Sequence, residues 1–275
     1  MLKKLLRYDF KAVFKYWWIA ALVSFVLSIG GGICIKLLGS EKILPEAIYI
    51  ISILVIVSVV ISYVVFSFLS TILVFTRFYK NFFTDEGYLT FTLPVKRTHL
   101  LNSKLILSVT TSIVTMLTCI FNILIMICIG LADVIFTKGF WVNAKYLFDT
   151  LVNDAGWYLL LYILELFILL LLSTIFSSLF LFICISFASI ITKKAKVITA
   201  IGIYYGANTI FTFIMQIFFM FGIPSLSYWM SDLPAASEHP MTSLIFLGIL
   251  LFMGIFCMLL YTLQYWMIDH KLNLN

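Results

Sequence analysis

The sequence predicts an all-α membrane protein with six transmembrane helices. Of its 275 residues, 63% are hydrophobic and only 11% are charged, and the mean hydropathy is +1.14. A soluble domain carries about 25% charged residues, so this chain has too little polar surface to cover a water-soluble globule. Two further observations agree with a membrane protein: six apolar runs are long enough to cross a bilayer, and the basic residues collect on alternate connections between them.

A helix needs about 20 apolar residues to cross a hydrocarbon core of about 30 Å. The runs that meet this length are residues 17–38, 47–76, 105–131, 157–191, 197–223 and 242–267. No composition break or low-complexity linker separates a soluble part. We therefore expect residues 1–275 to form a single transmembrane domain.

Basic residues indicate the orientation, because cytoplasmic connections are enriched in lysine and arginine. In a six-span topology, 14 of the 18 basic residues fall on one side of the membrane, in the N-terminal segment, the second and fourth connections and the C-terminal tail. The opposite side carries most of the acidic residues. This predicts a multi-pass protein of the cell membrane with both termini in the cytoplasm. It also explains the net charge of +6 without a nucleic-acid partner.

The N-terminal segment has an amphipathic helical pattern. At 100° per residue, Lys4, Arg7 and Lys11 fall on one stripe, and apolar residues such as Leu2 and Val13 fall opposite. Such a segment can form a separate helix in contact with membrane lipid at the cytoplasmic interface, or it can simply begin the first span. Asp9 lies in the middle of the apolar face. A carboxylate there needs a partner, so we expect it to contact a cytoplasmic connection.

The connection at 77–104 is too long for a minimal turn and too apolar for a solvated loop. Asp85 and Glu86 suit the positive end of a short helix, Gly87 ends or bends it, and Pro94 marks a new start. A short cytoplasmic element followed by a turn is predicted here.

This connection resembles a known family. The stretch E-G-Y-L-T-F-T-L-P-V-K-R-T-H-L-L-N-S-K, after two spans and a basic N-terminal helix, is similar to the first cytoplasmic loop of ABC transporter permeases of the type-2 exporter kind. The resemblance implies that residues 85–93 form a coupling helix that docks on a separate ATPase, and that the N-terminal helix is an interfacial elbow. The implied coupling residues are Asp85, Glu86, Gly87, Tyr88, Leu89, Pro94 and Arg97. The stretch 224–240 departs from the family, because it is short where the family often has a re-entrant helical element.

The resemblance also implies partners. A second permease subunit, identical or different, would complete the translocation pathway, and an ABC ATPase would bind ATP and Mg²⁺. This chain has no G-x-x-x-x-G-K-[ST] loop to cradle phosphates, so it is not expected to be an enzyme or to hold a cofactor or metal itself. Its weakly charged spans favour an amphipathic or hydrophobic cargo, such as an exported peptide.

Polar residues within the spans are candidates for the pathway. Asn122, Asn208 and Gln216 can form interhelical hydrogen bonds or line a path. Glu165 lies in a run that is longer than one span needs. It is either a solvated residue at the outer interface or an intramembrane carboxylate facing the pathway. Four tryptophans lie at the ends of runs, as expected for an interfacial aromatic belt: Trp17, Trp18, Trp157 and Trp266.

Two other functions are compatible with parts of this pattern. A substrate-binding membrane subunit or secondary transporter would need a polar pocket within one subunit and no exporter dimer. An intramembrane enzyme would need paired catalytic groups inside spans, and the sequence offers none.

Overall fold

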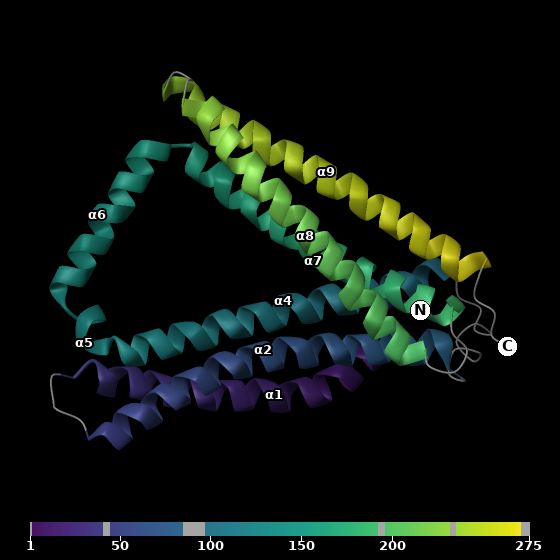
Figure 1. Ribbon diagram of the computed structural model, residues 1–275, viewed down its shortest axis with the longest axis horizontal. Helices are drawn as coiled ribbons and strands as arrows, with labels where there is room; N and C mark the ends of the chain where they lie inside the picture. The colour runs from purple at the N-terminus through teal and green to yellow at the C-terminus, as the bar shows by residue number, and fades with distance from the viewer. Residues whose placement is uncertain (1, 41–44, 85–96, 192–195, 232–234, 271–275) are drawn as a thin grey trace. The chain divides into compact units, whose positions relative to one another are not determined.

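The computed structural model describes residues 2–40, 45–84, 97–191, 196–231 and 235–270, and this part of the chain is helical with no strand (Figure 1). The helices are α1 (Leu2–Leu38), α2 (Glu46–Phe83), α4 (Arg97–Gly130), α5 (Ala132–Ile135), α6 (Lys138–Ala155), α7 (Tyr158–Ile191), α8 (Lys196–Ser231) and α9 (Ala235–His270). Six of them, α1, α2, α4, α7, α8 and α9, are long and apolar enough to cross a membrane. The chain is therefore a multi-pass membrane protein, as predicted.

Five of the six helices extend beyond the predicted apolar runs, whereas α7 lies within its run at 157–191. α1 continues without a break from Leu2 to Leu38, so a separate N-terminal helix is not confirmed. α4 begins at Arg97, and Leu100 and Leu101 in its first turns are buried. A hydropathy run ends where charged residues begin, whereas the helix continues as long as one of its faces can be buried.

Two connections between the long helices also differ from the sequence prediction. The stretch 224–240, which departs from the resembled family by being short, is largely taken up by the end of α8 and the start of α9, which contains Pro240. Membrane helices tolerate proline when neighbouring groups satisfy the freed carbonyl. The connection after the third span contains α5 and the 18-residue α6, which the sequence analysis did not predict.

The helices belong to two compact units. The first comprises Met1–Phe78 and Asn102–Thr150, and the second comprises Tyr79–Leu101 and Leu151–Asn275. In the first unit α1, α2 and α4 lie side by side (Figure 1). In the second, α7 packs against both α8 and α9. α7 is apolar around its whole circumference, which is typical of a helix that is covered on several sides.

Candidate functional site

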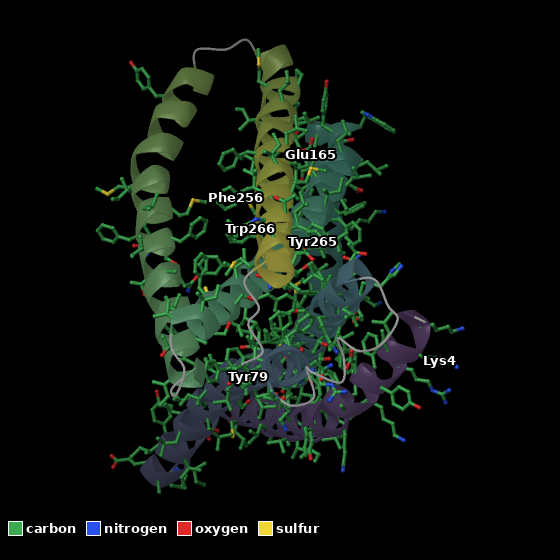
Figure 2. The ribbon with its side chains drawn as sticks, turned by 90° about the vertical axis from the view of Figure 1, so that its right-hand side faces the viewer. Lys4, Tyr79, Glu165, Phe256, Tyr265 and Trp266 are labelled. Carbon is green, nitrogen blue, oxygen red and sulfur yellow. The ribbon has the colours of Figure 1, made fainter. Side chains whose placement is uncertain are left out.

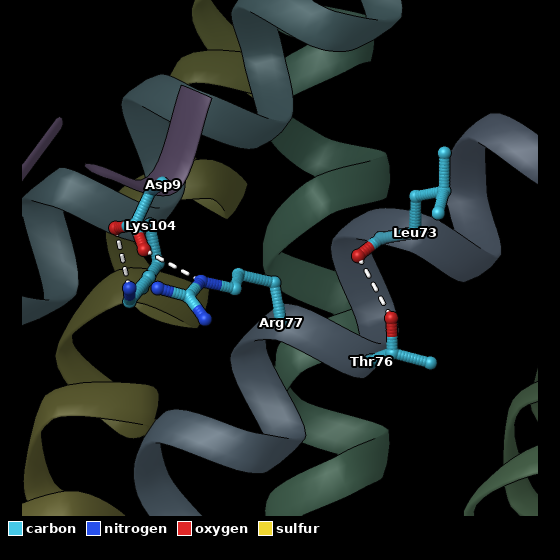
Figure 3. A network of polar contacts seen from close by, with 5 residues as sticks. All are labelled: Asp9, Leu73, Thr76, Arg77 and Lys104. Atoms are coloured by element: carbon cyan, nitrogen blue, oxygen red, sulfur yellow. Dashed lines mark hydrogen bonds and ion pairs between the residues drawn. The ribbon is translucent and has the colours of Figure 1, made fainter. Parts of the chain in front are cut away.

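A buried aspartate near the start of α1 holds one basic side chain from α2 and one from α4 (Figure 3). Arg77 Nε donates to Asp9 Oδ1 at 2.8 Å, and Lys104 Nζ donates to Asp9 Oδ2 at 2.5 Å. These three residues are called the Asp9 cluster below. The contact predicted for Asp9 is confirmed, although its partners lie on helices at the two ends of the 77–104 connection rather than in a loop.

The Asp9 cluster is shielded from water. Asp9 and Lys104 are each 2% exposed, while the Arg77 side chain is 26% exposed. An unpaired charge in such a place is strongly destabilising, and here each carboxylate oxygen receives its own cation. The three residues carry one more positive than negative charge, and the more exposed side chain is that of Arg77.

The Asp9 cluster joins the two ends of the 77–104 connection to α1. Arg77 is the first residue of the 77–104 connection and Lys104 is the last, so both ends of the connection pair with one carboxylate on α1. One helical turn deeper, Val13, Val74 and Leu107 are buried on the same three helices. A displacement of Arg77 or Lys104 must therefore either move α1 with it or break an ion pair with Asp9.

Further hydrogen bonds join the three helices along their length. Trp17 Nε1 donates to Thr115 Oγ1 at 2.9 Å, and the Thr115 hydroxyl also bonds the Ser70 hydroxyl at 2.9 Å. The Trp17 ring packs on Phe66 with centroids 5.5 Å apart. Trp17 is 2% exposed, so its predicted place in an interfacial aromatic belt is wrong, whereas the other three tryptophans of the predicted belt are exposed.

Deeper in the unit, Asn122 joins α4 to α1. Its Nδ2 donates to Ser24 Oγ at 3.0 Å, as one of the two interpretations of this residue predicts. Ser28 bonds the Tyr63 hydroxyl at 2.8 Å and so joins α1 to α2. These interhelical hydrogen bonds hold the three helices together well beyond the Asp9 cluster.

Glycines bring α1 and α4 together at the far end of the unit. A Cβ on Gly32 would lie 2.8 Å from Ile129 Cβ and 3.0 Å from the Met126 carbonyl oxygen. A Cβ on Gly130 would lie 2.7 Å from Ile35 Cγ2. Only residues without a side chain permit this approach, which is a common way for membrane helices to pack.

The second unit contains a separate polar cluster between α7 and α9. Glu165 is 6% exposed, and its Oε1 accepts a hydrogen bond from Ser243 Oγ at 2.5 Å. Figure 2 labels Glu165 where these two helices lie side by side. Its Oε2 has no partner among the residues that the structure describes. The interpretation of Glu165 as a solvated interfacial residue is therefore wrong.

One turn away, Tyr162 continues this cluster. Its hydroxyl bonds Thr242, and it lies 3.2 Å from both Nδ1 and the carbonyl oxygen of His239. Tyr158 stacks on the His239 ring with centroids 5.5 Å apart. Glu165, Ser243, Tyr162, Thr242, His239 and Tyr158 are called the α7–α9 cluster below.

Polar side chains form an exposed stripe on α8. Asn208 and Gln216 are exposed, and at 100° per residue they fall within a sector of about 100° with three other exposed polar residues. The three are Tyr205, Thr209 and Thr212. A polar stripe on a helix long enough to cross a membrane is unfavourable against lipid, so it indicates contact with water, cargo or another protein.

The remaining predicted residues have varied positions. Lys4, Arg7 and Lys11 are exposed along α1, and Figure 2 shows Lys4 pointing away from it. Arg97 is the first residue of α4. The predicted coupling residues Asp85, Glu86, Gly87, Tyr88, Leu89 and Pro94 lie outside the described residues.

Sequence patterns alone do not identify Arg77 and Lys104 as the partners of Asp9, or Ser243 as the partner of Glu165. The only signal for the first pair was that both basic residues stand next to apolar runs. Comparisons of the chain with family models, with curated proteins and with solved structures return no match.

Proposed function

We propose that this chain is the membrane-spanning permease subunit of an ATP-driven ABC exporter, coupled to a separate ATPase through its 77–104 connection. The observation that carries the proposal is the Asp9 cluster. A coupling segment transmits force only if both of its ends are fixed to the helices that must move. Arg77 and Lys104 provide this fixation, because both bind the same buried carboxylate on α1.

In this mechanism the partner ATPase binds ATP and Mg²⁺ and changes its own conformation. The permease responds if the ATPase binds one of the permease conformations more tightly than the other. A push on the connection reaches α2 through Arg77, α4 through Lys104 and α1 through Asp9. The bonds of Trp17 and Asn122 then favour movement of the three helices as one body.

The α8 stripe supports a second permease subunit, identical or different, with the pathway between the two. Asn208 and Gln216 would face that pathway or the second subunit rather than lipid. The low charge of the spans favours an amphipathic or hydrophobic cargo, such as a peptide. In this proposal both termini lie in the cytoplasm and the protein resides in the cell membrane.

Copurification tests this proposal. The tagged chain is solubilised gently from the cells that produce it, and the copurifying proteins are identified and assayed for ATP hydrolysis. We expect an ABC ATPase to copurify, and to be lost in the double charge reversal Asp85→Lys with Glu86→Lys. The matched control is Asp149→Lys with Asp154→Lys, which changes the same number of charges on the side predicted to face outward. Absence of an ATPase from every preparation would defeat the proposal.

A second candidate function is a substrate-binding membrane subunit or secondary transporter that forms no exporter dimer. The α7–α9 cluster favours it, because Glu165 places a buried carboxylate and a serine hydroxyl between two helices of one subunit. A monomeric protein that binds cargo without any ATPase would support this alternative.

A further inference from the structure

α6 separates its apolar and polar residues onto two faces. At 100° per residue, its apolar side chains occupy a sector of about 140°. That sector contains Phe140, Trp141, Leu147, Phe148, Leu151 and Val152. The opposite face contains Lys138, Asn143, Lys145, Tyr146, Asp149, Asn153 and Asp154, and Val142 is the one large aliphatic residue among them.

The apolar face of α6 is uncovered. None of the residues of α6 is buried, and the six apolar side chains are 37–62% exposed. Leu147, Phe148 and Leu151 alone place two aliphatic side chains and one aromatic ring on adjoining turns of the same face. A continuous apolar face of this size is unfavourable in water and needs a cover.

The connection to α7 indicates what this cover is. Only Gly156 and Trp157 separate α6 from α7, and Gly156 has a φ of 51°, which turns the chain between the two helices. The first turns of α7 expose Leu160, Ile163 and Leu164. Because α7 is a membrane-spanning candidate, lipid is the medium that covers these side chains, and two residues reach only about 7 Å. The end of α6 is therefore held close to lipid.

α6 has no net charge, unlike the basic amphipathic helices that bind anionic membrane surfaces. Two lysines and two aspartates balance, so the helix gains nothing from anionic head groups. Its binding to a membrane would depend on its apolar face alone.

We propose that α6 lies in the plane of the membrane interface, with Phe140, Trp141, Leu147, Phe148, Leu151 and Val152 in the lipid of the leaflet opposite the basic N-terminal segment. In that position α6 anchors the connection between α4 and α7 to the lipid surface. The proposal requires only that the chain spans a membrane, and it is independent of the exporter proposal.

Fluorescence quenching in the full-length protein tests this placement. A genetically encoded fluorescent amino acid replaces Phe148 on the apolar face, or Asn143 or Val142 on the opposite face, and the chain is reconstituted in phosphatidylcholine vesicles. Val142 is the matched control, because it is as apolar and exposed as the residues of the apolar face. The two quenchers are lipids brominated near the top of their acyl chains and aqueous iodide.

The probe at Phe148 should be quenched by brominated lipid at least about twofold more strongly than either control, and iodide should give the reverse order. Because α6 is electrically neutral, this contrast should be the same at high salt and in vesicles with anionic lipid. Equal quenching at all three positions would overturn the proposal. A Phe148 probe protected from both quenchers would also overturn it, since protein and not lipid would then cover the face.

Discussion

Asp9 and Lys104 lie 95 positions apart in the chain and bind each other in a place where each is 2% exposed. With Arg77, they tie the start of α1 to the two helices that flank the 77–104 connection. Such a buried ion pair adds little net stability compared with a well-packed apolar pair. Removing only one of its two charges is strongly destabilising, because the other charge is then buried without a partner.

Asp9→Asn should destabilise the protein by about 3–5 kcal/mol, because Lys104 is then left as a buried and uncompensated cation. The midpoint of unfolding by sodium dodecyl sulfate in mixed micelles measures this. Lys36→Met is the matched control, since the Lys36–Asp133 pair at 3.1 Å is exposed on both sides and should change stability by about 0–1 kcal/mol. Equal effects of the two substitutions would show that burial of the Asp9 cluster has no energetic consequence.

The double substitution Asp9→Leu with Lys104→Met should be less destabilising than Asp9→Asn alone. It removes both members of a buried pair and leaves apolar side chains in their place. If the proposed coupling is correct, this variant should fold and still bind the ATPase but export poorly. Normal export by a stable double variant would mean that the Asp9 cluster has only a structural role.

Gly32→Ala should destabilise the contact between α1 and α4 by about 1–3 kcal/mol, because the added Cβ meets Ile129 and the Met126 carbonyl. Gly30→Ala on the same helix is the control. A Cβ there meets nothing within 4 Å, and alanine favours the helix. The two melting temperatures should move in opposite directions, and a parallel shift would contradict the close approach of the helices.

Ser243→Ala should destabilise the protein by about 1–3 kcal/mol, because the Glu165 carboxylate then loses its one hydrogen bond among the described residues. Ser177→Ala removes a hydroxyl that bonds only within its own helix and should change stability by about 0.5 kcal/mol or less. In the Glu165→Gln background the effect of Ser243→Ala should shrink. An undiminished effect would show that the two side chains are not energetically coupled.

Asn208→Leu and Gln216→Leu should reduce transport without lowering stability, because both side chains are exposed on the α8 stripe. Phe213→Leu is the control, since Phe213 is exposed on α8 outside that stripe. Transport of a fluorescent amphipathic peptide into inverted vesicles measures the effect. Equal transport by the two stripe variants and the control would show that the α8 stripe does not line the pathway.

The sequence predicted the helices better than their ends or their partners. Six apolar runs correspond to six long helices because hydrophobic length is a direct physical requirement for crossing a membrane. Their ends were misjudged because amphipathic turns such as those of Leu100 and Leu101 continue a helix past its apolar run. α6 was missed because its apolar residues are spaced for one face and do not form a continuous run.

The partners of individual side chains were also harder to predict from the sequence than the helices themselves. The carboxylate of Asp9 was expected to find a partner, since its place on an apolar face made that necessary, but which basic residues it binds depends on tertiary packing. Trp17 stands at the end of a run, yet it is buried against Thr115 and Phe66. The sequence indicates how far along its helix a residue lies. Which neighbour its side chain meets depends on how the helices pack.

The most direct test of the central claim is photocrosslinking from the 77–104 connection in intact cells. A photoreactive amino acid replaces Tyr88, and in a separate control it replaces Phe148 on α6. We expect a crosslink from position 88 to an ABC ATPase and none from position 148. An absence of ATPase crosslinks from position 88 in cells that contain the stable protein, or the same crosslink from both positions, would contradict it.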